Sequence, residues 1–159
     1  MDNSKVKEDF LIAMRGTTST VNVISAKLND ERHAMTATSV TSLSLSPPTM
    51  IVCINKEAAI HNIIKEKAKF CINVLSNLQR ELSDVCSNFE EGESRFEDEG
   101  WVDETELVYN SNSVSNIICS CTRVVDYSTH SVFFGEVIRV TNNNKNKALL
   151  YVSGGYLVD

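Results

Sequence analysis

The sequence predicts a mainly β protein, built as an antiparallel barrel with short helices at its periphery. Apolar or β-branched runs recur along the chain with turn residues between them, which is typical of strands joined as hairpins. Helical spacing occurs only in short stretches, so the chain lacks the regular alternation of strand and helix found in parallel sheets. The 159 residues fit one domain, and we expect residues 1–159 to form it.

The first predicted elements are a helix and a hairpin. Apolar residues recur at helical spacing from Val6 to Met14, which predicts an amphipathic helix over 5–15. β-branched residues predict a strand over 20–25, and turn residues lead from it to a second strand over 34–40. Ser46-Pro47-Pro48 should end this region, because neither proline can donate to a sheet ladder.

The other elements follow the same two patterns. Continuous or alternating apolar runs predict strands, and apolar residues on one helical face predict helices. The strands are expected over 50–54, 70–75, 114–125, 132–140 and 148–152, and the helices over 60–64 and 78–89.

The charge is concentrated in one segment. Residues 90–106 hold nine acids and one base, a net charge of −8, while the remaining 14 bases and 12 acids give +2. We expect this segment to be a solvated surface loop. A nucleic-acid-binding protein would show a clustered basic face, which this sequence lacks. The first residues lack the apolar stretch of a signal peptide, and no run is long enough to span a membrane, so we expect a cytoplasmic protein.

The cysteines are expected to be buried and unpaired. Their number is odd and they form no CxxC pair, which argues against a disulfide framework and against a zinc site. Each lies in an apolar stretch, where cysteine usually packs as a small hydrophobe. They are Cys53, Cys71, Cys86, Cys119 and Cys121.

Residues 35–42 form an unusual strand, because five of the eight side chains carry hydroxyl groups. Such a stretch offers small donors, and its short side chains leave the backbone N–H groups reachable. Composition alone leaves two interpretations open: an edge strand wetted on one face, or a cradle for a ligand.

A second candidate is the turn that follows the strand 50–54. A helix N-terminus there would present free N–H groups to a phosphate. Asn55 is a good helix-capping residue, and Lys56 adds a cation. This signal is weak alone, because many turns between a strand and a helix have the same composition.

His130 is the most interesting of the three histidines, because it opens a strand that contains Phe133 and Phe134. A histidine in this position can line a pocket for a flat ring, or it can simply donate to the backbone of its turn. The sequence contains no GxSxG, HExxH or GxGxxG motif and no obvious carboxylate pair. Any chemistry is therefore expected to come from a cofactor.

Several stretches together resemble a known family. His33–Ser39, continued by Ser42–Pro48, is similar to the H-G-M-T-A-T-S … S-V-S-L-x-P-P stretch of the small flavin reductase components of two-component flavin-dependent monooxygenases. Ala58 stands where this family often has serine. Further matches in the same order are Val52–Lys56, Phe70–Leu75, Leu82-Ser83 with Phe89, Arg95-Phe96, His130–Val137, Leu149–Tyr151 and Gly154–Tyr156.

The resemblance implies an FMN-binding split β-barrel of Greek-key type that works as a homodimer. The implied reaction is hydride transfer from NADH or NADPH to FMN or FAD, and the reduced flavin would reach a partner monooxygenase. His130 would act as the catalytic residue and would face the nicotinamide together with Tyr156. The implied flavin-binding residues are Thr36, Ala37, Thr38, Ser39, Val40 and Ser42 for the ring and ribityl chain, Cys53, Ile54, Asn55, Ala58 and His61 near the phosphate, and Ser87, Asn88 and Phe89 from a neighbouring segment.

Three other functions are alternatives to this one. A flavin storage or sensor protein on the same fold would bind flavin without oxidising NAD(P)H. An interaction domain would bind no flavin at all. An oxidase of a phosphorylated pyridoxal-type substrate would need clustered cations, whereas the arginines are scattered through this sequence.

Overall fold

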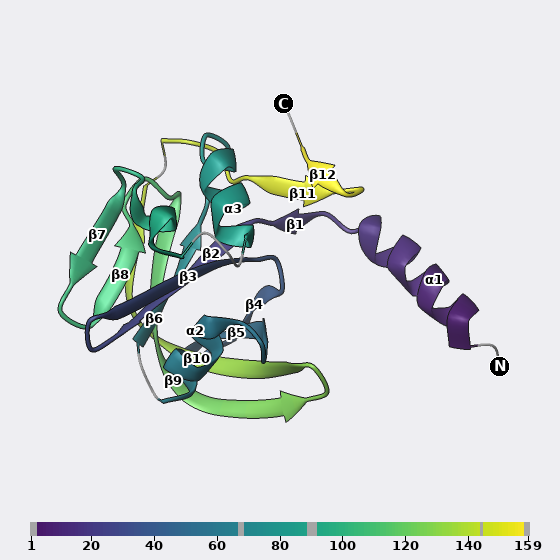
Figure 1. Ribbon diagram of the computed structural model, residues 1–159, viewed down its shortest axis with the longest axis horizontal. Coiled ribbons are helices and arrows are strands. Elements are labelled where there is room, and N and C mark those ends of the chain that lie inside the picture. Colours follow the sequence, from purple (N-terminus) through teal and green to yellow (C-terminus); the bar gives the residue numbers. More distant parts are fainter. Residues whose placement is uncertain (1–2, 67–68, 89–91, 144, 158–159) are drawn as a thin grey trace.

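The computed structural model describes residues 3–66, 69–88, 92–143 and 145–157 (Figure 1). Phe89, one of the expected flavin-binding residues, lies outside these ranges. The helices are α1 (Asn3–Arg15), α2 (Ala59–Lys65), α3 (Arg80–Ser87) and the 3-10 helix η1 (Gly92–Phe96). The strands are β1 (Ser19–Thr20), β2 (Asn22–Leu28), β3 (Glu31–Ala37), β4 (Val40–Leu45), β5 (Pro48–Asn55), β6 (Lys69–Val74), β7 (Trp101–Glu104), β8 (Leu107–Asn110), β9 (Ser115–Tyr127), β10 (His130–Asn142), β11 (Leu150–Val152) and β12 (Gly155–Tyr156).

The main sheet has seven antiparallel strands in the order β3-β2-β6-β9-β10-β5-β4. Its two edge strands, β3 and β4, are consecutive in the chain, and only Thr38 and Ser39 separate them. Three Cα steps cover at most about 11 Å, so the sheet has to curl until its opposite edges meet. No ladder joins β3 to β4 within the described residues. The predicted antiparallel barrel is therefore confirmed, and it is open along a seam at Thr38–Ser39.

The inside of the barrel is filled by large apolar side chains. Phe70 and Phe133 are fully buried there with Ile24, Val52 and Ile54. Helix α2 closes this core, because Ile60, Ile63 and Ile64 belong to the same cluster. Alternate residues of β2 point to opposite faces, so Val23 packs instead into a second core beneath α3, with Leu75, Leu82 and Phe96. The core thus fixes α2 and α3 on the barrel, where they border the cavities described below.

Two expectations about strands need correction. The predicted strand over 34–40 breaks after Ala37, and β4 continues to Leu45, so the seam lies inside the hydroxyl-rich stretch. Pro48 does not end the strand region but begins β5, paired with Leu45. Proline is tolerated at the first residue of a strand, where its missing N–H removes no ladder bond.

The acidic segment is not a plain solvated loop. It contains η1, with Phe96 buried, and β7, and it leads directly into β8, where Leu107 and Val108 are buried. Ion pairs hold it against β2 and β3: Lys27 Nζ lies 2.5 Å from Asp103 Oδ1, and Arg32 Nη2 lies 2.9 Å from Glu93 Oε2. Cations elsewhere in the chain therefore neutralise part of the acidic charge, which the local sequence could not indicate.

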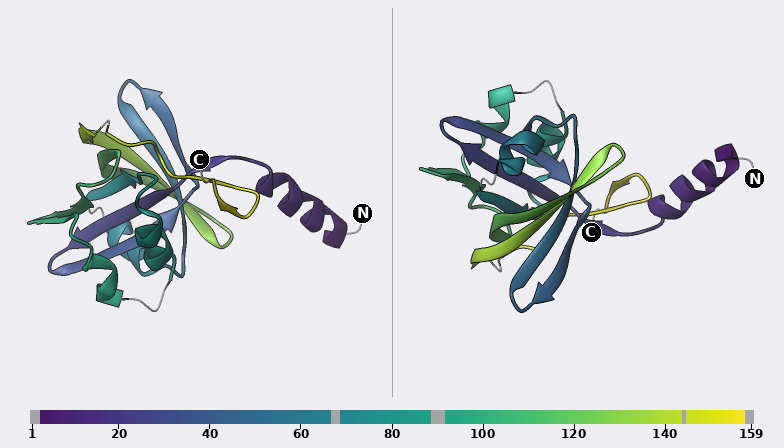
Figure 2. Two further views of the ribbon diagram at one scale, coloured as in Figure 1. Left: turned by 90° about the horizontal axis from the view of Figure 1, so that it is seen from above. Right: turned by 90° about the horizontal axis from the view of Figure 1, so that it is seen from below.

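The predicted N-terminal helix is confirmed as α1, and its last residue meets the rest of the chain, where the carbonyl of Arg15 accepts from the N–H of Ser153 at 2.7 Å. Figures 1 and 2 show it extending away from the barrel, and none of its residues is buried. The small sheet β1-β11-β12 lies between α1 and the barrel and joins both ends of the chain. No helix in the described part of the chain is long and apolar enough to cross a membrane.

The cysteines behave as the sequence predicts. All five are free thiols, four are buried, and Cys53 is half-buried.

Candidate functional site

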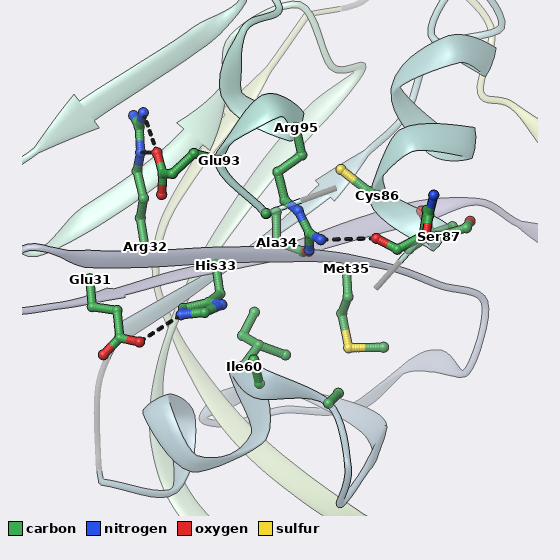
Figure 3. Close-up of a pocket in the computed structure, with 15 residues that line it drawn as sticks. Glu31, Arg32, His33, Ala34, Met35, Ile60, Cys86, Ser87, Glu93 and Arg95 are labelled. Carbon is green, nitrogen blue, oxygen red and sulfur yellow. Dashed lines mark hydrogen bonds and ion pairs between the residues drawn. The ribbon is translucent and has the colours of Figure 1, made fainter. Parts of the chain in front are cut away.

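Two cavities adjoin each other on either side of Thr36 and Ser87, which line both. The first, about 520 Å³ and here called the arginine cavity, is bordered by β3, α2, α3 and η1 (Figure 3). The second, about 500 Å³ and here called the tyrosine cavity, is bordered by β3, α3, β11 and β12. The arginine cavity is lined by Glu31–Thr36, Ala58–Ile60, Cys86–Asn88, Gly92, Glu93 and Arg95. The tyrosine cavity is lined by Val21, Thr36, Thr38, Arg80, Ser83, Asp84, Ser87, Tyr151 and Gly154–Tyr156.

Thr36 fixes the common wall of the two cavities. Its Oγ1 donates a hydrogen bond of 2.7 Å to the carbonyl oxygen of Ser83, which ties β3 to α3. Ser87 lies one helical turn further along α3, and its Oγ donates to the same carbonyl at 2.8 Å. The two hydroxyl groups therefore have a shared acceptor and a defined position.

The seam presents unused backbone donors. Within the described residues, the amide N–H groups of Thr38 and Ser39 donate no hydrogen bond, and both residues are exposed. The carbonyl of Ser39 accepts from the N–H of Cys53 at 3.0 Å, which fixes the seam against β5. The hydroxyl-rich stretch thus contains a strand break with free N–H groups, which are available to a ligand but are also typical of a solvated sheet edge.

Not every expected flavin-binding residue lines these cavities. Thr36, Thr38, Ala58, Ser87 and Asn88 do. Ala37 and Ile54 are buried in the barrel core, so their side chains are unavailable to a ligand. Val40, Ser39, Ser42, Cys53 and Asn55 lie along the seam and its neighbouring strands, outside both linings.

The turn between β5 and α2 differs from the expectation. Ala58, not Asn55, is the N-cap of α2, and it makes no side-chain capping bond. Asn55 Oδ1 instead accepts from the N–H of Glu57 at 3.0 Å, and the carbonyl of Asn55 accepts from Ala58 at 3.0 Å. The turn therefore uses several of its own N–H groups, and α2 has only seven residues. This turn alone is a weaker phosphate site than the sequence indicates.

His61 lines neither of these two cavities. It is 3% exposed, and its Nε2 lies 2.7 Å from Ser131 Oγ. Its ring meets Phe133 edge-on, with the ring centroids 5.2 Å apart. Burial removes the His61 imidazole from any surface where a phosphate could bind, so the expected contact between His61 and a flavin phosphate is revised.

His130 and Tyr156 are not brought together within one chain. His130 is exposed at the start of β10, and its Nδ1 lies 2.8 Å from Thr129 Oγ1. It lines neither cavity, whereas Tyr156 lines the tyrosine cavity. Figure 1 shows β12 and the turn between β9 and β10 well apart.

Comparison with known proteins now decides the family. The protein-family model described as "Flavin reductase like domain" matches residues 14–157. The chain belongs to the flavin reductase-like family.

Named relatives of this flavin reductase-like chain agree with that assignment. The reductase component of the FADH(2)-dependent resorcinol hydroxylase of Rhizobium sp. is 34% identical over 154 residues, which cover 95% of this chain and 86% of that protein. FMN reductase (NADH) RutF of Serratia proteamaculans is 29% identical over 154 residues, covering 94% and 86%. The solved structure of a Streptomyces globisporus NADH:FAD oxidoreductase has a TM-score of 0.88 and 25% identity, covering 100% of this chain and 96% of that one. The family's split-barrel fold and oxidoreductase chemistry are therefore confirmed.

The cavity walls of this flavin reductase-like protein fit a flavin. The free N–H groups of Thr38 and Ser39 suit the carbonyl oxygens of a flavin ring. In the arginine cavity, Arg95 donates to the carbonyl oxygens of Ala34 and Asn88, while its buried Nε has no partner among the described residues (Figure 3). An unpaired buried donor is costly, and Arg95 itself lines the arginine cavity, where its positive charge would attract a ligand phosphate.

Sequence patterns did not indicate one wall of the tyrosine cavity. Arg80, Asp84 and Ser87 follow one another at i, i+4 and i+7, which places them on a single face of α3 facing the tyrosine cavity. The polar face of the predicted helix carried this signal, because polar residues at helical spacing mark the side opposite the core. Arg95 was matched to the family stretch but was given no role.

Proposed function

We propose that this chain is an NADH-dependent flavin reductase that passes reduced flavin to a partner monooxygenase. The observation that carries the proposal is the pair of adjoining cavities in a chain of the flavin reductase-like family: Thr38, with its free N–H group, lines one cavity, and Arg95 lines the other. Its relatives are named as NADH-dependent reductases and as the reductase component of a hydroxylase. Residues 1–159 would form one flavin reductase-like domain. The protein would be cytoplasmic.

The proposed flavin site follows the seam. Thr36, Thr38 and Ser39 would hold the ring side, and Val40, Ser42 and Cys53 would continue the cradle along β4 and β5. Ala37, Ile54 and Asn55 would contribute through their backbone. Ala58, Ser87 and Asn88 line the arginine cavity and would face the phosphate end, where Arg95 adds a positive charge. His61 is left out, because its side chain is buried.

In the proposed reaction, bound FMN or FAD supplies the hydride acceptor, flavin N5, and NADH supplies the hydride from its nicotinamide ring. The protein's own task is to bind and orient the two rings. Holding two reactants in the correct geometry can remove a large part of the activation barrier. The N–H groups of Thr38 and Ser39 would stabilise the negative charge that hydride transfer adds to the flavin ring. His130 and Tyr156 would hold the nicotinamide.

The separation of His130 from Tyr156 supports a homodimer in which a second copy completes the site. Helix α1 gives independent support. An isolated helix shorter than about 12–15 residues is marginal in water, so the 13-residue α1 needs a partner surface. Its exposed apolar side chains are Val6, Phe10, Leu11, Ile12 and Met14.

The test is NADH and NADPH oxidation by the purified protein, with and without FMN, FAD and riboflavin. We expect rapid loss of NADH absorbance that depends on added flavin, and the same assay ranks the flavins. Flavin binding without NAD(P)H oxidation would leave a storage or sensor protein and would overturn the proposal. A protein that binds no flavin would favour the interaction domain.

A further inference from the structure

Two buried side chains, His61 and Ser131, and the exposed carboxylate of Asp126 form a hydrogen-bonded chain at the turn between β9 and β10. His61 Nε2 lies 2.7 Å from Ser131 Oγ, and Ser131 Oγ lies 2.6 Å from Asp126 Oδ1. Ser131 is fully buried and His61 nearly so. Accepting Ser131's hydrogen bond lowers the pKa of the Asp126 carboxyl, so Asp126 is an acceptor only.

The direction of each bond follows from this. Ser131 has a single hydroxyl proton and gives it to Asp126, so its oxygen must accept from His61. His61 therefore carries a proton on Nε2 and donates it to Ser131. The chain has one defined polarity, running from His61 through Ser131 to Asp126.

These hydrogen bonds connect two segments that are far apart in sequence. His61 belongs to α2, whereas Asp126 and Ser131 flank the β9–β10 turn on opposite strands. Two further contacts join the same segments: the N–H of Lys56 donates to the carbonyl of Thr129 at 3.0 Å, and Lys65 Nζ lies 3.4 Å from Asp126 Oδ2. The turn is thus fixed from below by α2 and the residues preceding it.

His130 is the first residue of β10, directly after this turn and next to Ser131. Its own side chain is exposed, and its ring contact is to the turn residue Thr129. The direction of the His130 ring therefore depends on how the turn is held. The hydrogen bonds from His61 through Ser131 to Asp126 are among the contacts that hold the turn.

We propose that His61 is a positioning residue for the reductase reaction: acting through Ser131 and Asp126, it holds the turn that presents His130 to the nicotinamide. This inference rests on the proposed function of His130. The buried imidazole of His61 then has a structural role instead of contacting the flavin phosphate. Ser131 and Asp126 share this role.

The experiment compares Ser131→Ala, Asp126→Ala and Asp126→Asn with the unmodified protein. Ser131→Ala leaves the His61 N–H buried without an acceptor, while the packing of His61 on Phe133 is retained. Asp126→Asn keeps an acceptor oxygen for Ser131 and should rescue most of the Asp126→Ala effect. Ser25→Ala is the matched control, because Ser25 is also fully buried and hydrogen-bonded, to Val108 O and Asn73 Nδ2, but lies on β2.

Two measurements are made on each variant. Amide hydrogen exchange over residues 127–131 reports how firmly the turn is held, and it requires no activity. Steady-state kinetics report kcat/KM for NADH and KM for flavin. We expect Ser131→Ala and Asp126→Ala to speed exchange in the turn and to lower kcat/KM for NADH roughly tenfold, with KM for flavin within about twofold. Ser25→Ala should change neither the turn nor kcat/KM.

A double-variant comparison separates positioning from a general loss of structure. If Ser131 acts through His130, then Ser131→Ala should have little further effect on kcat/KM for NADH in a His130→Ala background. Full additivity, or faster exchange with unchanged NADH kinetics, would overturn the positioning role. Unmodified protein that oxidises no NADH would instead overturn the proposed function, and unchanged exchange in Ser131→Ala would show that the chain does not hold the turn.

Discussion

The phenol of Tyr156 lies 2.6 Å from Asp84 Oδ1 and 2.9 Å from Ser83 Oγ, so the last described strand is tied to α3. Asp84 can only accept when ionised, so the phenol proton points to Asp84 and Ser83 donates to the phenol oxygen. The carbonyl of Ser83 in turn accepts from Thr36. One helix therefore connects the hydroxyl-rich strand to the C-terminal strand, and the tyrosine cavity lies between them.

Tyr156→Phe should keep the ring and lose both bonds. We expect the free energy of unfolding to fall by about 0.5–1.5 kcal/mol and KM for NADH to rise several-fold, with flavin binding unchanged. Denaturant unfolding and steady-state kinetics would measure these changes. Tyr109→Phe is the matched control, because Tyr109 donates to Glu104 on β7, outside both cavities. Equal kinetic effects of the two variants would remove Tyr156 from the nicotinamide site.

The proposed dimer predicts a solution mass of twice the 17.7 kDa chain. Phe10→Asp places a charge on the exposed apolar face of α1 and should shift the protein towards the monomer, because a buried unpaired charge is costly. Lys7→Gln, a polar change on the same helix, should leave the mass unaltered. Light scattering coupled to size-exclusion chromatography measures both, and a wild-type protein of single-chain mass would contradict the dimer.

If His130 and Tyr156 of one site come from different copies, two inactive variants should complement each other. After subunit exchange, mixed His130→Ala and Tyr156→Ala proteins should recover NADH oxidation, because a mixed dimer holds one intact pair. Each variant alone should stay impaired after the same treatment. Absence of recovery, with mixed dimers demonstrated, would place both residues of a site on one chain.

Gly135→Ala should destabilise the barrel. A Cβ at this position would lie 2.5 Å from Phe70 Cζ and 2.7 Å from Cys119 Cβ, inside the core. Overpacking of this kind costs about 1–3 kcal/mol, so thermal unfolding should occur several degrees lower. Gly16→Ala is the control, since its Cβ would meet only ordinary contacts from 3.4 Å outwards. A Gly135→Ala protein as stable as the Gly16→Ala protein would show that the core rearranges there at little cost.

The buried thiols should make the protein sensitive to alkaline pH. Burial raises the pKa of the Cys86 and Cys119 thiols from 9.0 to about 12. Between these values the unfolded chain loses thiol protons that the folded chain keeps, so stability is full below pH 9 and falls as the pH rises towards 12. Each thiol can contribute at most about 1.4 kcal/mol per pH unit. Urea unfolding of the reduced protein at increasing pH measures this, and Cys119→Ala should flatten the dependence.

Local patterns predicted the elements well where one face of an element meets the core. The helix over 5–15, the hairpin of β2 and β3 and the long strands β9 and β10 all follow the expected periodicity. The hairpin turn also forms at the predicted polar residues, with Asn29 at a φ of 56°, a conformation that asparagine tolerates better than most residues. Local patterns did not predict the structure of the acidic segment, because ion pairs with Lys27 and Arg32 on other strands hold it in place.

The amino-acid sequence by itself determined the antiparallel barrel, the family and the stretch that forms the seam, because those depend on local periodicity and on short motifs. The tertiary structure alone decided which side chains face a ligand. It buried His61 against Ser131, gave the capping role to Ala58, and placed Arg80, Asp84 and Arg95 around the cavities. The physical reason is that burial and hydrogen-bond partners are set by contacts between distant segments: Thr36 meets Ser83, and His61 meets Ser131, 70 positions further along the chain.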